Sequence, residues 1–103
     1  MILEVATLDV RPGRTDAFEA AFAEARRIIA AVPDYLSHEL QCCVENADRY
    51  ILLVRWARLE DHTQGFRRSP RYQEWKRLLH PFYDPFSTVE HYTPVFGAPD
   101  PQF

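Results

Sequence analysis

The 103 residues fit one domain, and a hydrophobic content of 47% with 14% aromatic residues favours a packed core over a disordered chain. A net charge of −3 excludes the basic footprint of a protein that binds nucleic acid or anionic membranes. No signal-like segment is present, and no apolar run approaches the ~20 residues that span a bilayer. We therefore expect a cytoplasmic protein.

Metal-binding spacings such as CxxC or HExxH do not occur among the two cysteines and four histidines, so we expect no metal site. Cys42 and Cys43 are adjacent on a predicted strand, where neighbouring side chains face opposite sides. That geometry disfavours a bond between them and predicts two buried free thiols.

The first half of the chain predicts a strand, a helix and a hairpin. Residues 1–10 are apolar on both alternating sets of positions, which is typical of a strand covered on both faces. A helix with one apolar stripe follows to about Val32, and Asp16 with Glu19 can form a capping box at its start.

Residues 35–45 then alternate, with Leu36, His38 and Leu40 on the apolar side, where His38 is expected to be a partnered core or interface group. A turn at 46–48 leads to residues 49–56, which are again apolar on both sets of positions. We expect this strand to lie in the centre of a sheet.

The second half predicts a helix interrupted at Ser69-Pro70. Residues 59–66 place His62 and Phe66 on one face of a short helix. Ser69 suits an N-cap and Pro70 the first position of a second helix. Its apolar stripe consists of Tyr72, Trp75, Leu78, Leu79 and Phe82. A last strand is predicted over 86–93.

The element order is β-α-β-β-α-β, which predicts an α+β ferredoxin-like domain with an antiparallel sheet and both helices on one face. We assign residues 1–93 to this domain and 94–103 to a proline-rich C-terminal tail. The apolar side of the sheet away from the helices would be too large a patch for a monomer. A homodimer that packs sheet against sheet is the expected cover.

Several segments resemble the antibiotic biosynthesis monooxygenase family of dimeric α+β barrels. They are the opening strand followed by Arg11-Pro12-Gly13, the strand end Arg55-Trp56, Leu59-Glu60-Asp61-His62, and Ser69-Pro70-Arg71-Tyr72. The resemblance extends from Met1 to Tyr92. It implies a pocket between sheet and helices that holds a flat aromatic substrate.

The resemblance further implies a cofactor-independent monooxygenase, in which a small phenolic or quinol substrate supplies the electrons that reduce dioxygen. His62 is then the expected polar partner or base, because an imidazole titrates near neutral pH. The expected aromatic wall consists of Trp56, Phe66, Tyr72, Trp75 and Phe82.

Other interpretations remain open. His62 can equally be a buried histidine with a structural partner, and aromatic residues at helical spacing more often belong to a core than to a pocket. A dimer of the same fold could bind a small apolar ligand without catalysis, or act as an isomerase or lyase. The resemblance disfavours haem degradation, because haem-degrading members of the family carry an asparagine on the first strand, a tryptophan and an axial histidine. Here the first strand has no asparagine, and the tryptophan and histidine positions carry Phe66 and Lys76.

Overall fold

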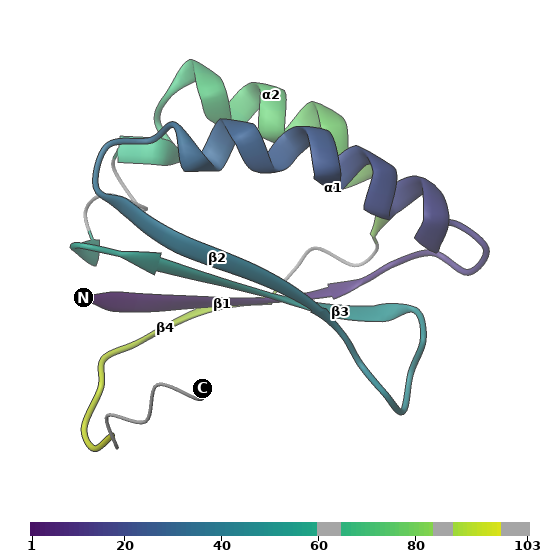
Figure 1. Ribbon diagram of the computed structural model, residues 1–103. Helices are drawn as coiled ribbons and strands as arrows, with labels where there is room; N and C mark the ends of the chain where they lie inside the picture. Colours follow the sequence, from purple (N-terminus) through teal and green to yellow (C-terminus); the bar gives the residue numbers. More distant parts are fainter. Residues whose placement is uncertain (60–64, 84–87, 98–103) are drawn as a thin grey trace.

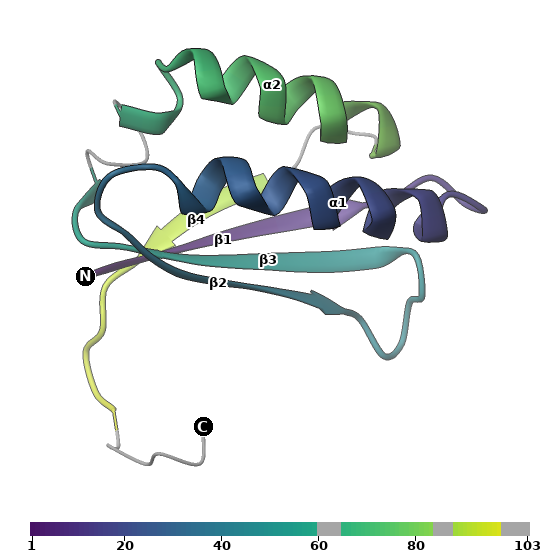
Figure 2. The ribbon, with the colours of Figure 1, turned by 45° about the horizontal axis from the view of Figure 1, so that its top comes forward.

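A computed structural model of the chain describes residues 1–59, 65–83 and 88–97, and in these ranges both helices cover the same face of one sheet (Figures 1 and 2). The elements are β1 (Ile2–Asp9), α1 (Thr15–Ala30), β2 (Tyr35–Cys42), β3 (Arg49–Trp56), α2 (Pro70–Leu79), a 3₁₀ turn (His80–Phe82) and β4 (Thr88–Tyr92). The predicted α+β ferredoxin-like fold is confirmed.

The described strands form an antiparallel sheet in the order β2-β3-β1-β4. β1 and β3 are the two central strands, which confirms the central position predicted for residues 49–56. In the register of β1 with β4, Ala6 lies opposite Val89 and Glu4 opposite His91, so these four residues share the face under the helices. The last strand predicted over 86–93 is confirmed for Thr88–Tyr92.

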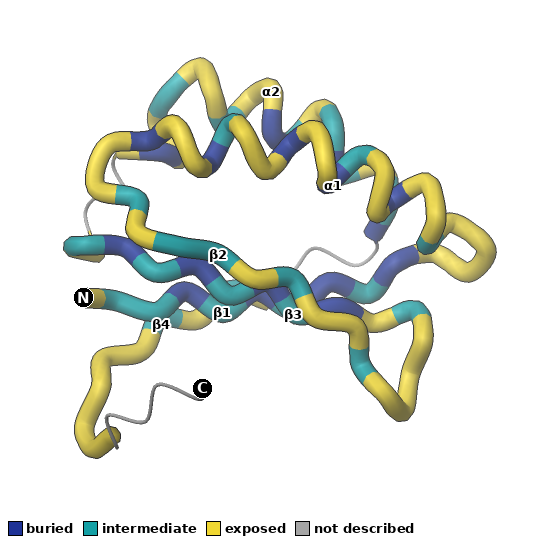
Figure 3. Tube along the Cα trace, viewed as in Figure 1, coloured by how far each residue is buried: buried dark blue, intermediate teal, exposed yellow. Residues whose placement is uncertain are grey.

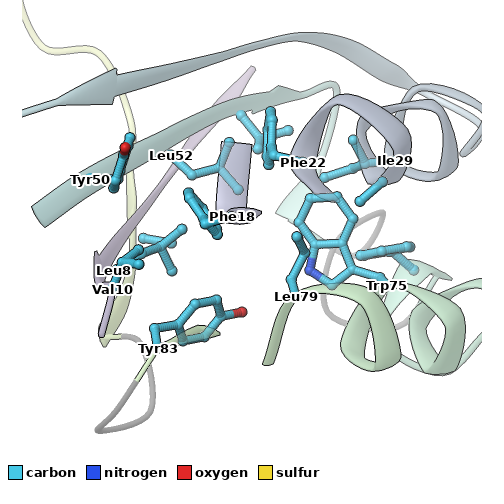
Figure 4. Close-up of a cluster of buried hydrophobic side chains, with 14 of the residues drawn as sticks. Leu8, Val10, Phe18, Phe22, Ile29, Tyr50, Leu52, Trp75, Leu79 and Tyr83 are labelled. Atoms are coloured by element: carbon cyan, nitrogen blue, oxygen red, sulfur yellow. The ribbon is translucent and has the colours of Figure 1, made fainter. Parts of the chain in front are cut away.

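The core lies between this inner face of the sheet and the two helices (Figures 3 and 4). Phe18 and Ile29 of α1 and Leu79 of α2 are at most 2% exposed, and they pack over Leu52 and Val54 of β3. None of the described helices is long and apolar enough to cross a membrane.

The start of α1 differs from the expected capping box. The N-cap position is Arg14, and no side chain caps the first turn. Glu19 instead accepts a hydrogen bond of 2.5 Å from the Tyr50 hydroxyl on β3. A tertiary partner has therefore replaced the local hydrogen bond that the spacing of Asp16 and Glu19 predicted.

The first residues of β2 also depart from the predicted alternation. Asp34 adopts a left-handed conformation with φ of 65°, and the pairing with β3 shifts between Tyr35 and Ser37. This bulge turns Leu36 outward, where it is 51% exposed. The expectation that Leu36 shares the apolar side with His38 and Leu40 was wrong.

Both cysteines are free thiols, but their expected burial was wrong. Cys42 is exposed and Cys43 is half-buried. β2 ends at Cys42, and the hairpin from residue 43 to 48 runs away from the helices (Figure 1), so no second layer covers these side chains.

Ser69 and Pro70 begin α2 as predicted, although the Ser69 hydroxyl donates to the Phe66 carbonyl at 2.7 Å and does not cap the helix. The short helix predicted over 59–66 falls mostly outside the described residues. Residues 93–97 are exposed and leave β4 on the side of the sheet opposite the helices (Figures 1 and 3). The boundary between domain and tail at residue 93 stays a prediction.

Leu79→Ala is expected to lower the free energy of unfolding by about 2–4 kcal/mol, because the 1% exposed side chain would leave a cavity between α2 and the sheet. Leu36→Ala makes the same chemical change at a 51% exposed site and should alter stability by no more than about 0.5 kcal/mol. Urea unfolding of both variants measures the difference. Equal losses in the two would contradict the assigned core.

Candidate functional site

A small cavity lies between the inner face of the sheet and α2. Its volume is about 40 Å³. Because a water molecule occupies about 30 Å³ in the liquid, this space holds water but not an aromatic ring. A substrate would therefore enter only after side chains on the helix side have moved.

Aromatic rings form the helix side of this cavity. Phe66 meets Tyr72 edge-on at a centroid distance of 5.4 Å and Trp75 edge-on at 5.8 Å. Phe66 and Trp75 are almost fully buried, whereas Tyr72 is partly exposed. Three of the five predicted wall residues are thus brought together on one surface.

The other two predicted wall residues lie elsewhere. Trp56 is fully buried with its ring 6.3 Å from that of Phe66, and it is not among the residues that line the cavity. Phe82 packs 6.1 Å from Phe18, and the guanidinium of Arg14 lies 5.2 Å above its ring. His62 lies outside the described residues, and its role stays a prediction.

Glu4 is the buried acidic residue of this region and lines the cavity from β1. It is 5% exposed, and its Oε1 accepts a hydrogen bond of 2.9 Å from the Trp56 indole Nε1–H. Burial raises the pKa of the Glu4 carboxyl, while the bond from Trp56 and the charge of Arg67 oppose the rise. Trp56 therefore contributes to the cavity by holding Glu4.

Basic side chains surround this carboxyl from three other parts of the chain. Arg67 precedes α2 and lines the cavity, as does His80, which follows α2. His91 lies directly opposite Glu4 in the register of β4 with β1. Burial lowers the pKa of His80, assisted by Lys76 and Arg67, and it lowers the pKa of His91, assisted by Arg67. Both imidazoles are therefore held in their neutral form at pH 7.

The sequence indicated that Glu4 is buried, although Glu4 was not predicted as a site residue. Glu4 occupies the same alternating set of β1 positions as the apolar Ala6 and Leu8, so it had to face the core. Arg67, His80 and His91 carried no comparable signal, because only the fold brings them to one place.

A larger open groove lies on the other side of the inner face, between α1 and β2. Its volume is about 450 Å³, and Phe22, Arg26, His38 and Tyr50 are among its lining residues. His38 is half-buried and shares a hydrogen bond through Nδ1 with the Tyr35 hydroxyl, which confirms the expected partnered histidine. Within the described residues, no three metal-binding side chains come together.

The buried carboxyl predicts a pH dependence of stability. Because the folded pKa of Glu4 lies above the unfolded value, its contribution is fully present below the ordinary pKa of 4.5 and is lost as the pH rises through the folded pKa. The stability of the wild type relative to Glu4→Gln is therefore expected to fall as the pH rises over this range, in urea unfolding at several pH values.

Glu74→Gln is the matched control for this titration. The bonds from Arg77 lower the pKa of Glu74, so the wild type should gain stability relative to this variant as the pH rises. Glu74 is solvent-exposed, so the effect is weak. A flat or rising difference for Glu4→Gln would contradict the buried position of Glu4.

The chain is an α+β ferredoxin-like domain with a small aromatic-walled cavity between the sheet and the helices, and comparison with known proteins identifies its family. The model of the antibiotic biosynthesis monooxygenase family matches residues 1–78, and the chain belongs to this family.

The chain is also similar to individual proteins in sequence and in structure. An uncharacterized protein of Bacillus subtilis, YczJ, is 50% identical over 95 residues, which are 92% of this chain and 100% of YczJ. A Bordetella bronchiseptica structure assigned to the antibiotic biosynthesis monooxygenases is 33% identical, with a TM-score of 0.88 over 92% of this chain and 97% of that one. A mutant of SnoaB from Streptomyces nogalater, described as a cofactor-independent oxygenase, shares the fold at 20% identity, with a TM-score of 0.78 over 96% and 97% of the chains.

Proposed function

We propose that the protein is a cofactor-independent monooxygenase that oxidises a small phenolic or quinol-type aromatic substrate with dioxygen in the cavity beside α2. The observation that supports this best is the meeting of an aromatic wall, formed by Phe66, Tyr72 and Trp75, with the polar groups of Glu4 and His80. A flat ring suits such a wall, and its hydroxyl requires polar partners of this kind.

The proposed monooxygenase reaction requires few groups from the protein. A phenol that loses its proton becomes electron-rich, and the substrate then supplies the electrons that reduce dioxygen. One oxygen atom enters the substrate, and the other leaves as water with two of the substrate's hydrogens. The chain contributes a base, an apolar enclosure and exclusion of water. We assign the base to His62, and the description of SnoaB as a cofactor-independent oxygenase supports the reaction class.

We also propose that the active form is a homodimer. The face of the sheet away from the helices carries Leu3 and Val5 of β1 with Ile51 and Leu53 of β3, and no described element covers it (Figure 2). These four side chains form one apolar surface, which we call the outer face. A second copy that packs on the outer face would remove it from water.

Oxygen uptake tests the proposed activity. Purified wild-type protein should consume oxygen with at least one member of a hydroquinone panel, and His62→Ala should lower kcat by about 10²-fold or more without changing the sedimentation coefficient. His38→Ala is the matched control, because His38 lines the separate groove by α1, and it should keep wild-type uptake. Absence of uptake with every phenol tested would contradict the proposal and favour a ligand-binding dimer.

A further inference from the structure

Residues 93–97, which we call the arm, leave β4 on the side of the sheet that carries the outer face (Figures 1 and 2). The start of the arm is fixed, because Tyr92 pairs with Leu3 of β1. Thr93 is followed by Pro94, whose ring restricts its own backbone and favours an extended conformation in the residue before it. The local sequence therefore directs the chain away from its own sheet.

The arm presents two large apolar side chains to solvent. Val95 is 85% exposed and Phe96 is 97% exposed, so neither is buried against the sheet of its own copy. The arm and the sheet border an open hollow of about 380 Å³, to which Leu3 and Arg55 contribute from the strands. Because Leu3 also belongs to the outer face, this hollow is continuous with that face.

We propose that the arm of each copy packs against the outer face of the other copy in the homodimer. A two-fold axis makes the contact reciprocal, so one arrangement covers both arms and both faces. The reach of the arm permits the contact, because five residues span up to about 17 Å and packed sheets lie about 10 Å apart. This inference rests on the proposed homodimer and adds a segment that contact between the sheets alone does not require.

The composition of the two surfaces favours a second copy as the partner. The sequence of the arm, Thr-Pro-Val-Phe-Gly, contains no charged residue. On the outer face, Val5 and Leu53 lie in the centre of the row that Glu39 of β2 and Glu90 of β4 complete at its two ends. An uncharged arm therefore suits the apolar stripe along β1 and β3, between the two acidic edges.

Photo-crosslinking tests the position of the arm. The residue p-benzoyl-phenylalanine in place of Phe96 keeps a phenyl ring and bonds to neighbouring groups on illumination. We expect a covalent dimer on a denaturing gel, in which mass spectrometry joins the arm of one copy to β1 or β3 of the other. The same probe in place of Ala20, which is exposed on α1, should give no covalent dimer. Crosslinks confined to one copy, crosslinks between the two arms alone, or no crosslinks from the arm would overturn the inference.

A charge on the arm should weaken the dimer. Phe96→Asp is expected to raise the dissociation constant at least about 10-fold in sedimentation, because each dimer loses the burial of two aromatic side chains. The variant should keep its fold in circular dichroism, since Phe96 is exposed in the single copy. Ala20→Asp is the matched control and should change the dissociation constant by less than about twofold. An equal effect of the two substitutions would overturn the inference.

The same measurements separate the arm from the proposed function. A wild-type protein that sediments at 12.1 kDa would overturn the homodimer and the arm together. A wild-type dimer whose dissociation constant Phe96→Asp leaves unchanged would overturn the arm and leave the homodimer standing. Neither readout uses oxygen uptake, so a failure of the monooxygenase activity would leave this inference intact.

Discussion

Replacing Trp56 with alanine is expected to lower the free energy of unfolding by about 3–5 kcal/mol. The side chain is 0% exposed and is among the largest fully buried groups of the described chain. Its loss would empty the space next to Phe66 and would also leave the Glu4 carboxyl without the bond from the indole. Both effects act in the same direction, because a cavity and the loss of a buried hydrogen bond each destabilise the fold.

Trp56→Phe is the matched control, since it keeps an aromatic ring and removes only the donor and part of the volume. We expect it to cost about 1–3 kcal/mol. Urea unfolding followed by circular dichroism measures both variants. Equal losses for alanine and phenylalanine would show that the hydrogen bond to Glu4 dominates, and a loss below about 1 kcal/mol for alanine would contradict the core position of Trp56.

Leu53→Glu is expected to convert the proposed homodimer into monomers. Leu53 lies in the middle of the outer face, with Val5 opposite it on β1 and Glu39 opposite it on β2. A glutamate there would place a charge in the proposed contact and beside a like charge, and breaking such an interface costs several kcal/mol. Sedimentation should show a species of 12.1 kDa, whereas the wild type should show twice this mass.

The control for this dissociation adds the same charge on the opposite side of the molecule. Ala20 is exposed on α1, so Ala20→Glu should leave the mass in solution unchanged. Circular dichroism should show that both variants remain folded. A wild-type protein that sediments at 12.1 kDa at micromolar concentration would contradict the dimer, and the outer face would then need another cover.

Much of the fold could be predicted because the strongest patterns in the sequence are set by burial. The apolar residues on both sides of β3 predicted its place in the centre of the sheet, and the helical stripes identified Phe18, Ile29 and Leu79 as core. These patterns persist along whole elements, so no single tertiary contact can override them.

Local signals failed where the tertiary structure offered an alternative. The capping box of α1 lost Glu19 to the Tyr50 hydroxyl. The alternation of β2 continued through Leu36 in the sequence, but a bulge after the left-handed Asp34 turned that residue outward. Tyr50 lies 31 residues from Glu19, beyond the reach of a local pattern. The alternation of residues 35–45 contains no information about a shift in their register with β3.

The candidate site was harder to predict than the fold. The family resemblance implied a wall that includes Phe66, Tyr72 and Trp75, but helical spacing could not distinguish a pocket wall from core. In the structure these residues line the cavity and also pack in the core. Phe82 shares the same stripe, yet it packs against Phe18 on another side of the core. Glu4 was not predicted as a site residue, because the core positions of β1 were predicted from apolar residues alone and Glu4 is the charged residue among them.

A crystal structure of the protein soaked anaerobically with hydroquinone tests the central claim most directly. Without oxygen the ligand cannot turn over, so its position reports binding alone. We predict that the ring displaces Tyr72 or Trp75, lies against Phe66 and brings a hydroxyl within hydrogen-bond distance of Glu4. A ring bound only in the groove between α1 and β2, beside Phe22, or no bound ring at all, would contradict the account.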